Sequence, residues 1–286
     1  MLKSSTIQLL RFHFSFFLMP VYWFSLSQVI QVNVVNAILI FFILHGLVYP
    51  ASNGYNSYMD RDTGPVGGIK NPQQPTKELF YTTVVMDITA LLLSLRISLV
   101  FFAGILAFIA ASRAYSYRGI RLKKYPIGGY LTVIFFQGAV IYFLVKHGSS
   151  HIKSLYIPLI PMLASSLLVG GFYPLTQIYQ HEQDKADGVK TLSYLLGYRG
   201  TFIFTGIIYT LAIITLAYYF GNNLELDRFF LIQICMLPVL VYFFWWFYKV
   251  SKNVSEANFK NTMRMNILAS ACTNAAFILL FIIEKY

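Results

Sequence analysis

The sequence predicts an all-α membrane protein: a bundle of nine transmembrane helices forming one domain over residues 1–286. Three observations predict it, namely an apolar composition, long uninterrupted apolar runs, and basic residues gathered on one side of those runs. Of the 286 residues, 57% are hydrophobic and 12% are charged, and the mean hydropathy is +0.61. Soluble domains have roughly 25% charged residues, so this composition excludes an ordinary soluble protein.

Nine apolar runs are separated by polar, glycine-containing or proline-containing stretches. Each is near the length of about 20 residues that a helix needs to cross a bilayer. Because the runs are continuous and not alternating, they favour helices over a β-barrel. The third and fourth runs are separated only around Arg96. The runs cover about residues 9–28, 33–52, 80–97, 99–117, 127–145, 155–178, 201–220, 229–248 and 266–283.

The basic residues predict the orientation of these spans. With the N-terminus in the cytoplasm, 17 of the 22 Lys and Arg residues fall on the cytoplasmic side and 5 on the other. This asymmetry is the positive-inside signal and places the C-terminus outside. The net charge of +11 is then mainly a topology signal and an attraction to anionic membrane lipids, so no nucleic-acid partner is expected. We expect the bacterial inner (cytoplasmic) membrane.

Six of the 11 carboxylates lie in the two loops after the second and sixth spans, both predicted to be cytoplasmic. In each loop an amide precedes an aspartate by four residues, Asn56 before Asp60 and Gln180 before Asp184. If the spans continue as helices, this spacing places each pair on one face, one turn apart. The six acids are Asp60, Asp62, Glu78, Glu182, Asp184 and Asp187.

Clustered oxygen ligands among basic residues are typical of a Mg²⁺ and diphosphate site. Mg²⁺ binds a few carboxylates together with waters and substrate phosphates. Metal and Lys or Arg stabilise the negative charge that grows on a departing diphosphate. The alternative is a solvated surface of mixed charges, which is common for loop acids. The basic residues predicted at this face include Lys77, Arg118, Arg121, Lys123, Lys124 and Lys190.

These motifs resemble those of the UbiA superfamily of intramembrane prenyltransferases. Its members are nine-helix bundles with NxxxDxxxD after the second helix and DxxxD after the sixth. Asn56-Ser57-Tyr58-Met59-Asp60 is similar to the start of the first motif, and the segment from Gln180 through Asp184 to Leu196-Gly197 is similar to the second. Tyr117-Arg118-Gly119-Ile120-Arg121 looks like the family's YxxxK element, with Arg for Lys. The resemblance covers essentially the whole chain.

The resemblance implies a Mg²⁺-dependent transferase that moves a polyprenyl group from its diphosphate to a lipophilic acceptor, which we expect to be aromatic. Asp60 and Asp184 are then the expected catalytic residues. The implied diphosphate-binding residues are Tyr117, Arg121, Lys123 and Lys77. The implied metal-binding residues are Asn56, Asp60 and Asp184, then Asp62, Gln180 and Asp187.

The chain also departs from the family pattern, and the departures favour a second hypothesis. Gly64 stands where the first motif has its last Asp, and Gln180 stands where the second motif has its first. Asp62, Glu182 and Asp187 are possible replacements, although Gly188 predicts that the helix ends just after Asp187. A non-catalytic or altered member that binds an isoprenoid diphosphate is therefore the alternative.

A small-solute transporter is the third hypothesis, from another class of protein. Many transporters carry broken helices and polar groups at the membrane midplane. Here the polar residues gather at one face, which counts against transport.

Three side chains near the spans have two interpretations each. Asp87 is an intramembrane acid with either a functional role or a partner on a neighbouring span. Arg113 either reaches the diphosphate or extends to the lipid head groups, and Arg11 has the same ambiguity. His181 is expected to point away from the face that Gln180 and Asp184 share.

Overall fold

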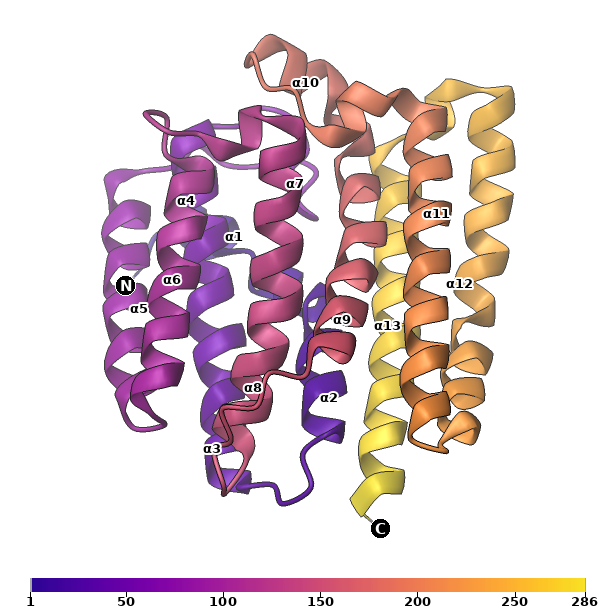
Figure 1. The fold of residues 1–286 in the computed structure, drawn as a ribbon. Helices are drawn as coiled ribbons and strands as arrows, with labels where there is room; N and C mark the ends of the chain where they lie inside the picture. Colours follow the sequence, from indigo (N-terminus) through magenta and orange to yellow (C-terminus); the bar gives the residue numbers. More distant parts are fainter. Residues whose placement is uncertain (1, 286) are drawn as a thin grey trace. The chain divides into compact units, whose positions relative to one another are not determined.

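The computed structural model describes residues 2–285, and all of their regular segments are helical (Figure 1). The α-helices are α1 (Ser4–Leu10), α2 (Met19–Ser27), α3 (Val34–Phe41), α4 (Tyr49–Asp60), α5 (Lys77–Leu95), α6 (Leu99–Ser116), α7 (Pro126–Ile134), α8 (Ile141–Ser149), α9 (Leu159–Phe172), α10 (His181–Ala186), α11 (Leu192–Asn222), α12 (Leu226–Lys252) and α13 (Phe259–Lys285). Short 3₁₀ segments are η1 (Phe12–Phe17), η3 (Leu122–Lys124), η5 (Tyr173–Gln180) and η6 (Val254–Glu256), and π-helical segments are η2 (Phe42–Val48) and η4 (Phe135–Val140).

The predicted fold class is confirmed. In the described part of the chain, eight helices are long and apolar enough to cross a membrane. The N-terminal pair Ser4–Phe17 and Met19–Ser27 passes the same test together and is bent by 41°, which gives up to nine spans. Several helices extend beyond their apolar runs, as α11 does beyond residues 201–220.

Local sequence signals set several helix starts. The side chains of Asn33, Ser98 and Thr191 each accept a hydrogen bond from the backbone N–H three residues later and so cap α3, α6 and α11. Pro126 begins α7, where its missing N–H costs no helical hydrogen bond. The short break around Arg96 is real, since α5 ends at Leu95 and α6 begins at Leu99.

The residues divide into two compact units, each described by itself. Unit 1 comprises Met1–Phe16, Val29–Lys123 and Leu144–Leu155, and unit 2 comprises Phe17–Gln28, Lys124–Phe143 and Tyr156–Tyr286. That the chain is one domain stays a prediction.

In unit 1, α4 packs against α1, α5 and α6, and polar contacts within the membrane join them. Ser52 of α4 and Ser112 of α6 share a hydrogen bond of 2.5 Å. Arg113 of α6 donates through Nε to Asp87 Oδ2 at 3.0 Å, and its guanidinium lies 3.9 Å from the centre of the Tyr55 ring. Asp87 therefore pairs with a neighbouring span. Arg113 is the other member of this pair and also donates through Nη1 to Thr83 Oγ1 at 3.3 Å.

In unit 2, α11 packs against α9 and α12, and α13 packs against α12 and α2 (Figure 1). Gly138 allows η4 to approach α9, because a Cβ there would lie 2.5 Å from Ser166 Cα. Phe24 and Phe277 stack with ring centres 4.7 Å apart in the core. The outer row of α12 is apolar and exposed, as expected of a lipid-facing surface, with Phe230, Ile234, Leu237, Val241 and Phe244 on it.

Candidate functional site

The first predicted motif lies on the last turn of α4, in unit 1. Asn56 donates through Nδ2 to Asp60 Oδ2 at 2.8 Å, so the two side chains lie on one face one turn apart, as the spacing predicts. The helix ends at Asp60 because Arg61 adopts a left-handed backbone conformation with φ of 55°. Asp62 follows this turn and so does not continue the helical face.

Three basic side chains surround Asp60. Lys123 Nζ lies 2.5 Å from Asp60 Oδ2, and Arg121 lies 3.7 Å from Asp60 Oδ1. Arg118 donates through Nε to the carbonyl oxygen of Met59 at 2.8 Å and lies within 3.4 Å of the carbonyl oxygen of Asp60. The Asp60 side chain is 3% exposed, so one nearly buried carboxylate contacts two cations while a third bonds to the adjacent backbone. The excess of positive charge around Asp60 favours the binding of a further anion at this position.

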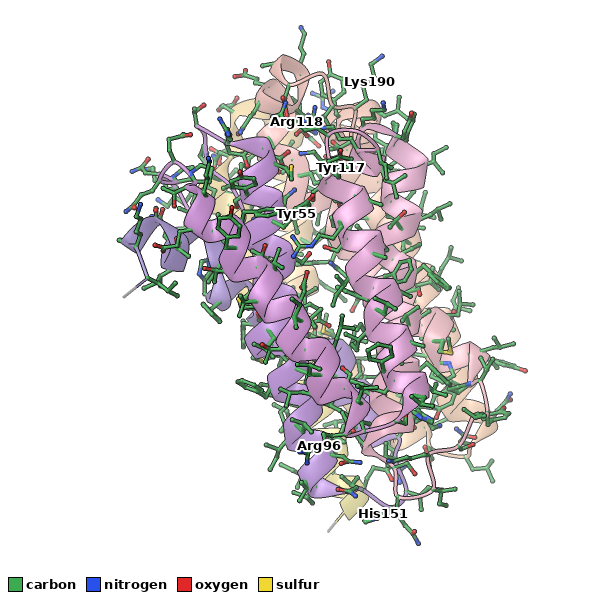
Figure 2. All side chains as sticks on the ribbon, turned by 90° about the vertical axis from the view of Figure 1, so that its left-hand side faces the viewer. Tyr55, Arg96, Tyr117, Arg118, His151 and Lys190 are labelled. Atoms are coloured by element: carbon green, nitrogen blue, oxygen red, sulfur yellow. The ribbon has the colours of Figure 1, made fainter. Side chains whose placement is uncertain are left out.

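Asn56 is held by residues from two other elements. Its Nδ2 also donates to Ser116 Oγ of α6 at 3.1 Å, and its Oδ1 accepts from Arg11 at 3.4 Å. Arg11 is buried and donates to the carbonyl oxygen of Asn53 at 3.0 Å. A contact of Ser116 with the first motif was not predicted. The four-residue spacing of Ser112 and Ser116, which places both side chains on one face of α6, could have indicated it. Figure 2 shows Tyr117 and Arg118 at the same end of unit 1 as Tyr55, opposite Arg96 and His151.

The other residues predicted to bind diphosphate lie at different places. The Tyr117 carbonyl oxygen accepts from the backbone N–H of Arg121 at 2.7 Å, which closes the turn that presents Arg121. The Tyr117 ring is exposed. Lys77 is exposed at the start of α5, next to Glu78, which bonds to Lys3 and Thr6 of the N-terminal segment. Within residues 2–285, the cations in contact with the Asp60 carboxylate are Lys123 and Arg121, and Lys77 does not contact it.

The oxygens of Asn56 and Asp60 fit a hard cation such as Mg²⁺. Asp60 Oδ1 is buried without a hydrogen-bond partner among residues 2–285, and Asn56 Oδ1 has only the long contact to Arg11. In the same range, no three His, Cys, Asp or Glu side chains converge closely enough to hold a metal. Two protein oxygens fit a Mg²⁺ ion that completes its shell with water and phosphate oxygens.

The second motif lies in unit 2 and has a different backbone. The 3₁₀ segment η5 runs to Gln180, and the α-helix resumes only at His181. Gln180, with φ of −100° and ψ of 2°, stands at the N-cap position of α10, and its side chain makes no capping hydrogen bond. Gln180 is therefore the last residue of the 3₁₀ segment, and Asp184 lies four residues later within α10.

Asp184 is held by its own segment. Its backbone carbonyl oxygen accepts from Val189 N at 2.8 Å, and its Oδ2 accepts from Thr191 Oγ1 at 3.2 Å. The helix ends at Ala186, Asp187 caps it, and Gly188 turns the chain with φ of 67°, as the glycine predicts. Thr191 was not predicted, and it also caps α11 by accepting from Tyr194 N at 3.3 Å.

His181 is buried and packs against the start of α11. Its Nε2 shares a hydrogen bond of 2.8 Å with Ser193 Oγ, and its ring stacks on Tyr198 at 4.5 Å. Ser193 Oγ in turn lies 3.0 Å from Thr201 Oγ1. These contacts brace the start of α11 on either side of its break at Gly197, where φ is 68° and ψ is 177°.

The fold and these segments define an integral, multi-pass membrane protein with a carboxylate and basic residues at the end of a span. The chain belongs to the UbiA prenyltransferase family, whose pattern matches residues 15–268. A search of curated proteins gives no match to the sequence.

Solved structures share the fold at low sequence identity. A UbiA homolog from Archaeoglobus fulgidus, bound to DMAPP and Mg²⁺, is 19% identical with a TM-score of 0.70, covering 98% of this chain and 100% of the other. The apo UbiA homolog from Aeropyrum pernix K1 is 16% identical with a TM-score of 0.71, covering 94% and 98%. Digeranylgeranylglyceryl phosphate synthase is 16% identical with a TM-score of 0.62, covering 97% and 96%.

Proposed function

We propose that this protein is a Mg²⁺-dependent intramembrane prenyltransferase that moves a polyprenyl group from its diphosphate to a lipophilic acceptor. One observation carries the proposal: the Asp60 carboxylate, 3% exposed, lies among Lys123, Arg121 and Arg118 beside Asn56. Family membership and the DMAPP and Mg²⁺ bound to the Archaeoglobus homolog support it.

The basic residues serve to hold the leaving group. When a diphosphate binds, Lys123 and Arg121 exchange part of their pairing with Asp60 for phosphate oxygens, which frees the carboxylate for a cation. Arg118 and the turn at Tyr117 keep these cations in place. A bound Mg²⁺ supplies charge stabilisation to the diphosphate oxygens. We assign Asn56 and Asp60 of unit 1 to the cation, with Asp62 in a secondary role. The assignment of Asp184, Gln180 and Asp187 to the metal stays a prediction from the sequence.

In the proposed reaction, the bond between the prenyl C1 carbon and the diphosphate oxygen breaks, and its electron pair leaves with the diphosphate. An electron pair of the acceptor forms the new bond to C1, and the acceptor loses a proton. The protein's contribution is electrostatic, because donors placed where charge develops stabilise the transition state.

The test is diphosphate release from labelled farnesyl or geranylgeranyl diphosphate by purified protein in detergent, with Mg²⁺ or with EDTA. Candidate aromatic acceptors are added, and Asp60→Asn and Asp184→Asn are compared with Asp227→Asn, which changes an exposed aspartate on α12. We expect release that requires Mg²⁺, falls at least about 100-fold in the first two variants, and is unchanged in the third.

A second candidate is a family member that binds an isoprenoid diphosphate without turnover. Gly64 and Gln180, at positions where the family motifs have carboxylates, favour it. Donor binding without Mg²⁺-dependent release would support this candidate and contradict transfer. Absence of donor binding would contradict both.

A further inference from the structure

The lipid-facing surface of unit 2 ends in basic side chains that the proposed site does not use. The apolar outer row of α12 continues into Trp245 and Tyr248, which are 43% and 62% exposed. The last turn of the helix then carries Lys249 and Lys252, both exposed. On this face an apolar surface therefore passes through two aromatic rings into two positive charges.

The two lysines are folded back onto these rings. Lys249 Nζ lies 5.7 Å from the centre of the Trp245 ring, and Lys252 Nζ lies 5.8 Å from the centre of the Tyr248 ring. Side chains on a helix lean toward its N-terminus, so each lysine reaches the ring one turn earlier. The two ammonium groups consequently lie at the level of the rings, where the apolar row ends, and interact with the ring faces.

A third cation comes from the neighbouring helix. Arg199, exposed near the start of α11, donates through Nη2 to the carbonyl oxygen of Ser251 at 2.8 Å. Ser251 immediately precedes Lys252, and α11 packs beside α12 (Figure 1). This bond uses one of the five N–H groups of the guanidinium and leaves the others for a ligand. Arg199 and Lys252 therefore border the same outer surface from two helices.

These positive charges have no carboxylate to balance them. Among residues 2–285, none of Arg199, Lys249 and Lys252 forms an ion pair. The acid that follows α12, Glu256, accepts a hydrogen bond from Asn261 Nδ2 of α13 at 2.8 Å. Cations gathered on one surface without an acid raise the local potential and favour an anion there.

The apolar surface beside the cations decides which kind of anion fits. A soluble phosphate would use the cations alone. A phospholipid would also cover the exposed apolar row of α12 and the matching row of α11, which includes Ile203, Ile207 and Ile214. Two apolar rows on adjacent helices suit a lipid with two acyl chains, and anionic head groups are attracted to basic residues at the membrane surface.

A topology signal alone does not account for this arrangement. The positive-inside rule requires basic residues near the ends of the spans and no particular contacts between them. Here one cation is bonded to the end of the neighbouring helix, and two lie on aromatic rings. Those contacts hold the charged groups next to the apolar rows.

We propose that Arg199, Lys249 and Lys252 bind the phosphate of an anionic phospholipid, whose acyl chains lie along the outer rows of α11 and α12. Arg199 offers two parallel N–H groups to the phosphate oxygens, and the lysines supply point charges. This lipid site lies in unit 2 and does not depend on the proposed prenyl transfer.

Trp245 itself reports the lipid at this position. The protein is reconstituted into vesicles of phosphatidylcholine and phosphatidylglycerol in equal parts, with bromine on the acyl chains of one lipid or the other. Brominated chains quench the fluorescence of a tryptophan that they touch, so the ratio of quenching measures which lipid occupies the site. The parent protein carries Trp23→Phe, and Trp246 is 0% exposed, which leaves Trp245 as the accessible indole.

For the parent protein we expect phosphatidylglycerol to be preferred at least about fivefold, the value of one basic residue at a membrane surface. In the double variant Arg199→Gln with Lys252→Gln the preference falls below about twofold, because two of the three cations are lost. The matched control is Lys260→Gln. It removes the same charge from the exposed second residue of α13, which begins where α12 ends, and retains the preference.

Equal quenching by the two lipids in the parent protein would overturn the proposal, as would an unchanged preference in the folded double variant. An equal loss in Lys260→Gln would overturn it too, by showing that the general charge of this end attracts the lipid. Loss of the preference on adding inorganic diphosphate, but not sodium chloride of the same ionic strength, would identify a soluble anion as the ligand instead. If the double variant does not fold, Lys252→Gln decides, since the Lys252 side chain is exposed.

Discussion

The two motif regions have the same spacing of amide and aspartate, yet they are held together by different kinds of contact. Around Asp60, the partners come from distant parts of the chain: Arg11, Ser116 and Lys123 are 45 to 63 residues away from the side chains they contact. Around Asp184, the hydrogen bonds described above come from Val189 and Thr191, five and seven residues away.

This difference has a physical origin in the backbone. In α4 the α-helix continues to Asp60, so its last turn presents side chains to the neighbouring helices. In the second region the chain leaves the α-helix at η5, resumes it for six residues in α10, and turns at Gly188. In this region the hydrogen bonds from Val189 and Thr191 to Asp184 close the turn that follows α10. The comparison therefore teaches that the first region depends on tertiary packing and the second on local turn chemistry.

The largest expected effect tests the tertiary network of unit 1. Asp87→Ala leaves the Arg113 guanidinium without its carboxylate between α5 and α6. Because an uncompensated charge remains within the membrane span, we expect the free energy of unfolding to fall by about 3–5 kcal/mol, measured by unfolding in detergent micelles. The exposed Asp227→Ala serves as control, with a change within about 0.5 kcal/mol. A loss below about 1 kcal/mol for Asp87→Ala would show that this ion pair does not hold the region.

The next effect concerns donor affinity and uses two adjacent lysines. Lys123 contacts the Asp60 carboxylate, whereas Lys124 is exposed and lies near the Tyr125 ring. We expect Lys123→Met to weaken binding of farnesyl diphosphate with Mg²⁺ by about 10- to 100-fold, the value of a charge-assisted hydrogen bond in a shielded site.

Lys124→Met removes the same charge, and we expect it to change the affinity less than about threefold. Titration calorimetry or a filter-binding assay measures both. Equal effects of the two variants would show that general positive charge, and not the contact geometry at Asp60, attracts the donor.

Two glycines with positive φ sharpen the comparison between the regions. Gly67, with φ of 45°, has no room for a Cβ because one would overlap the Arg11 guanidinium, whereas nothing lies within 4 Å of a Cβ at Gly188. Gly188→Ala is expected to cost about 1–2 kcal/mol for the left-handed backbone alone. Gly67→Ala should cost about 1–3 kcal/mol more through overpacking. It should also weaken donor binding, because Arg11 contacts Asn56. Equal thermal destabilisation would contradict the tighter packing of the first region.

The smallest effect concerns the local contacts of the second region. Thr191→Val removes both the hydrogen bond to Asp184 and the cap of α11. We expect a loss of about 1 kcal/mol in unfolding free energy, typical of a lost helix cap, together with slower diphosphate release at unchanged donor affinity. Thr191→Ser retains the hydroxyl and restores both properties. Failure of serine to restore them would assign the effect to the threonine methyl group.

Much of the fold was predictable because the physical cause is contained in the sequence. Apolar runs of membrane-spanning length determine the helices, since a backbone in lipid must satisfy its own hydrogen bonds. The spacing of Asn56 and Asp60 predicts their shared face, and Gly188 predicts the end of α10.

The remaining features were decided by the tertiary structure, because they depend on which helix packs beside which. The sequence shows that Asp87 needs a partner, but only the packing of α5 on α6 selects Arg113. Likewise Ser116 reaches Asn56 across 60 residues, and the chain adopts 3₁₀ geometry from Tyr173 to Gln180, just before α10. Side-chain spacing along one helix is a local property, whereas the partners of a buried charge or amide are fixed only when distant segments fold together.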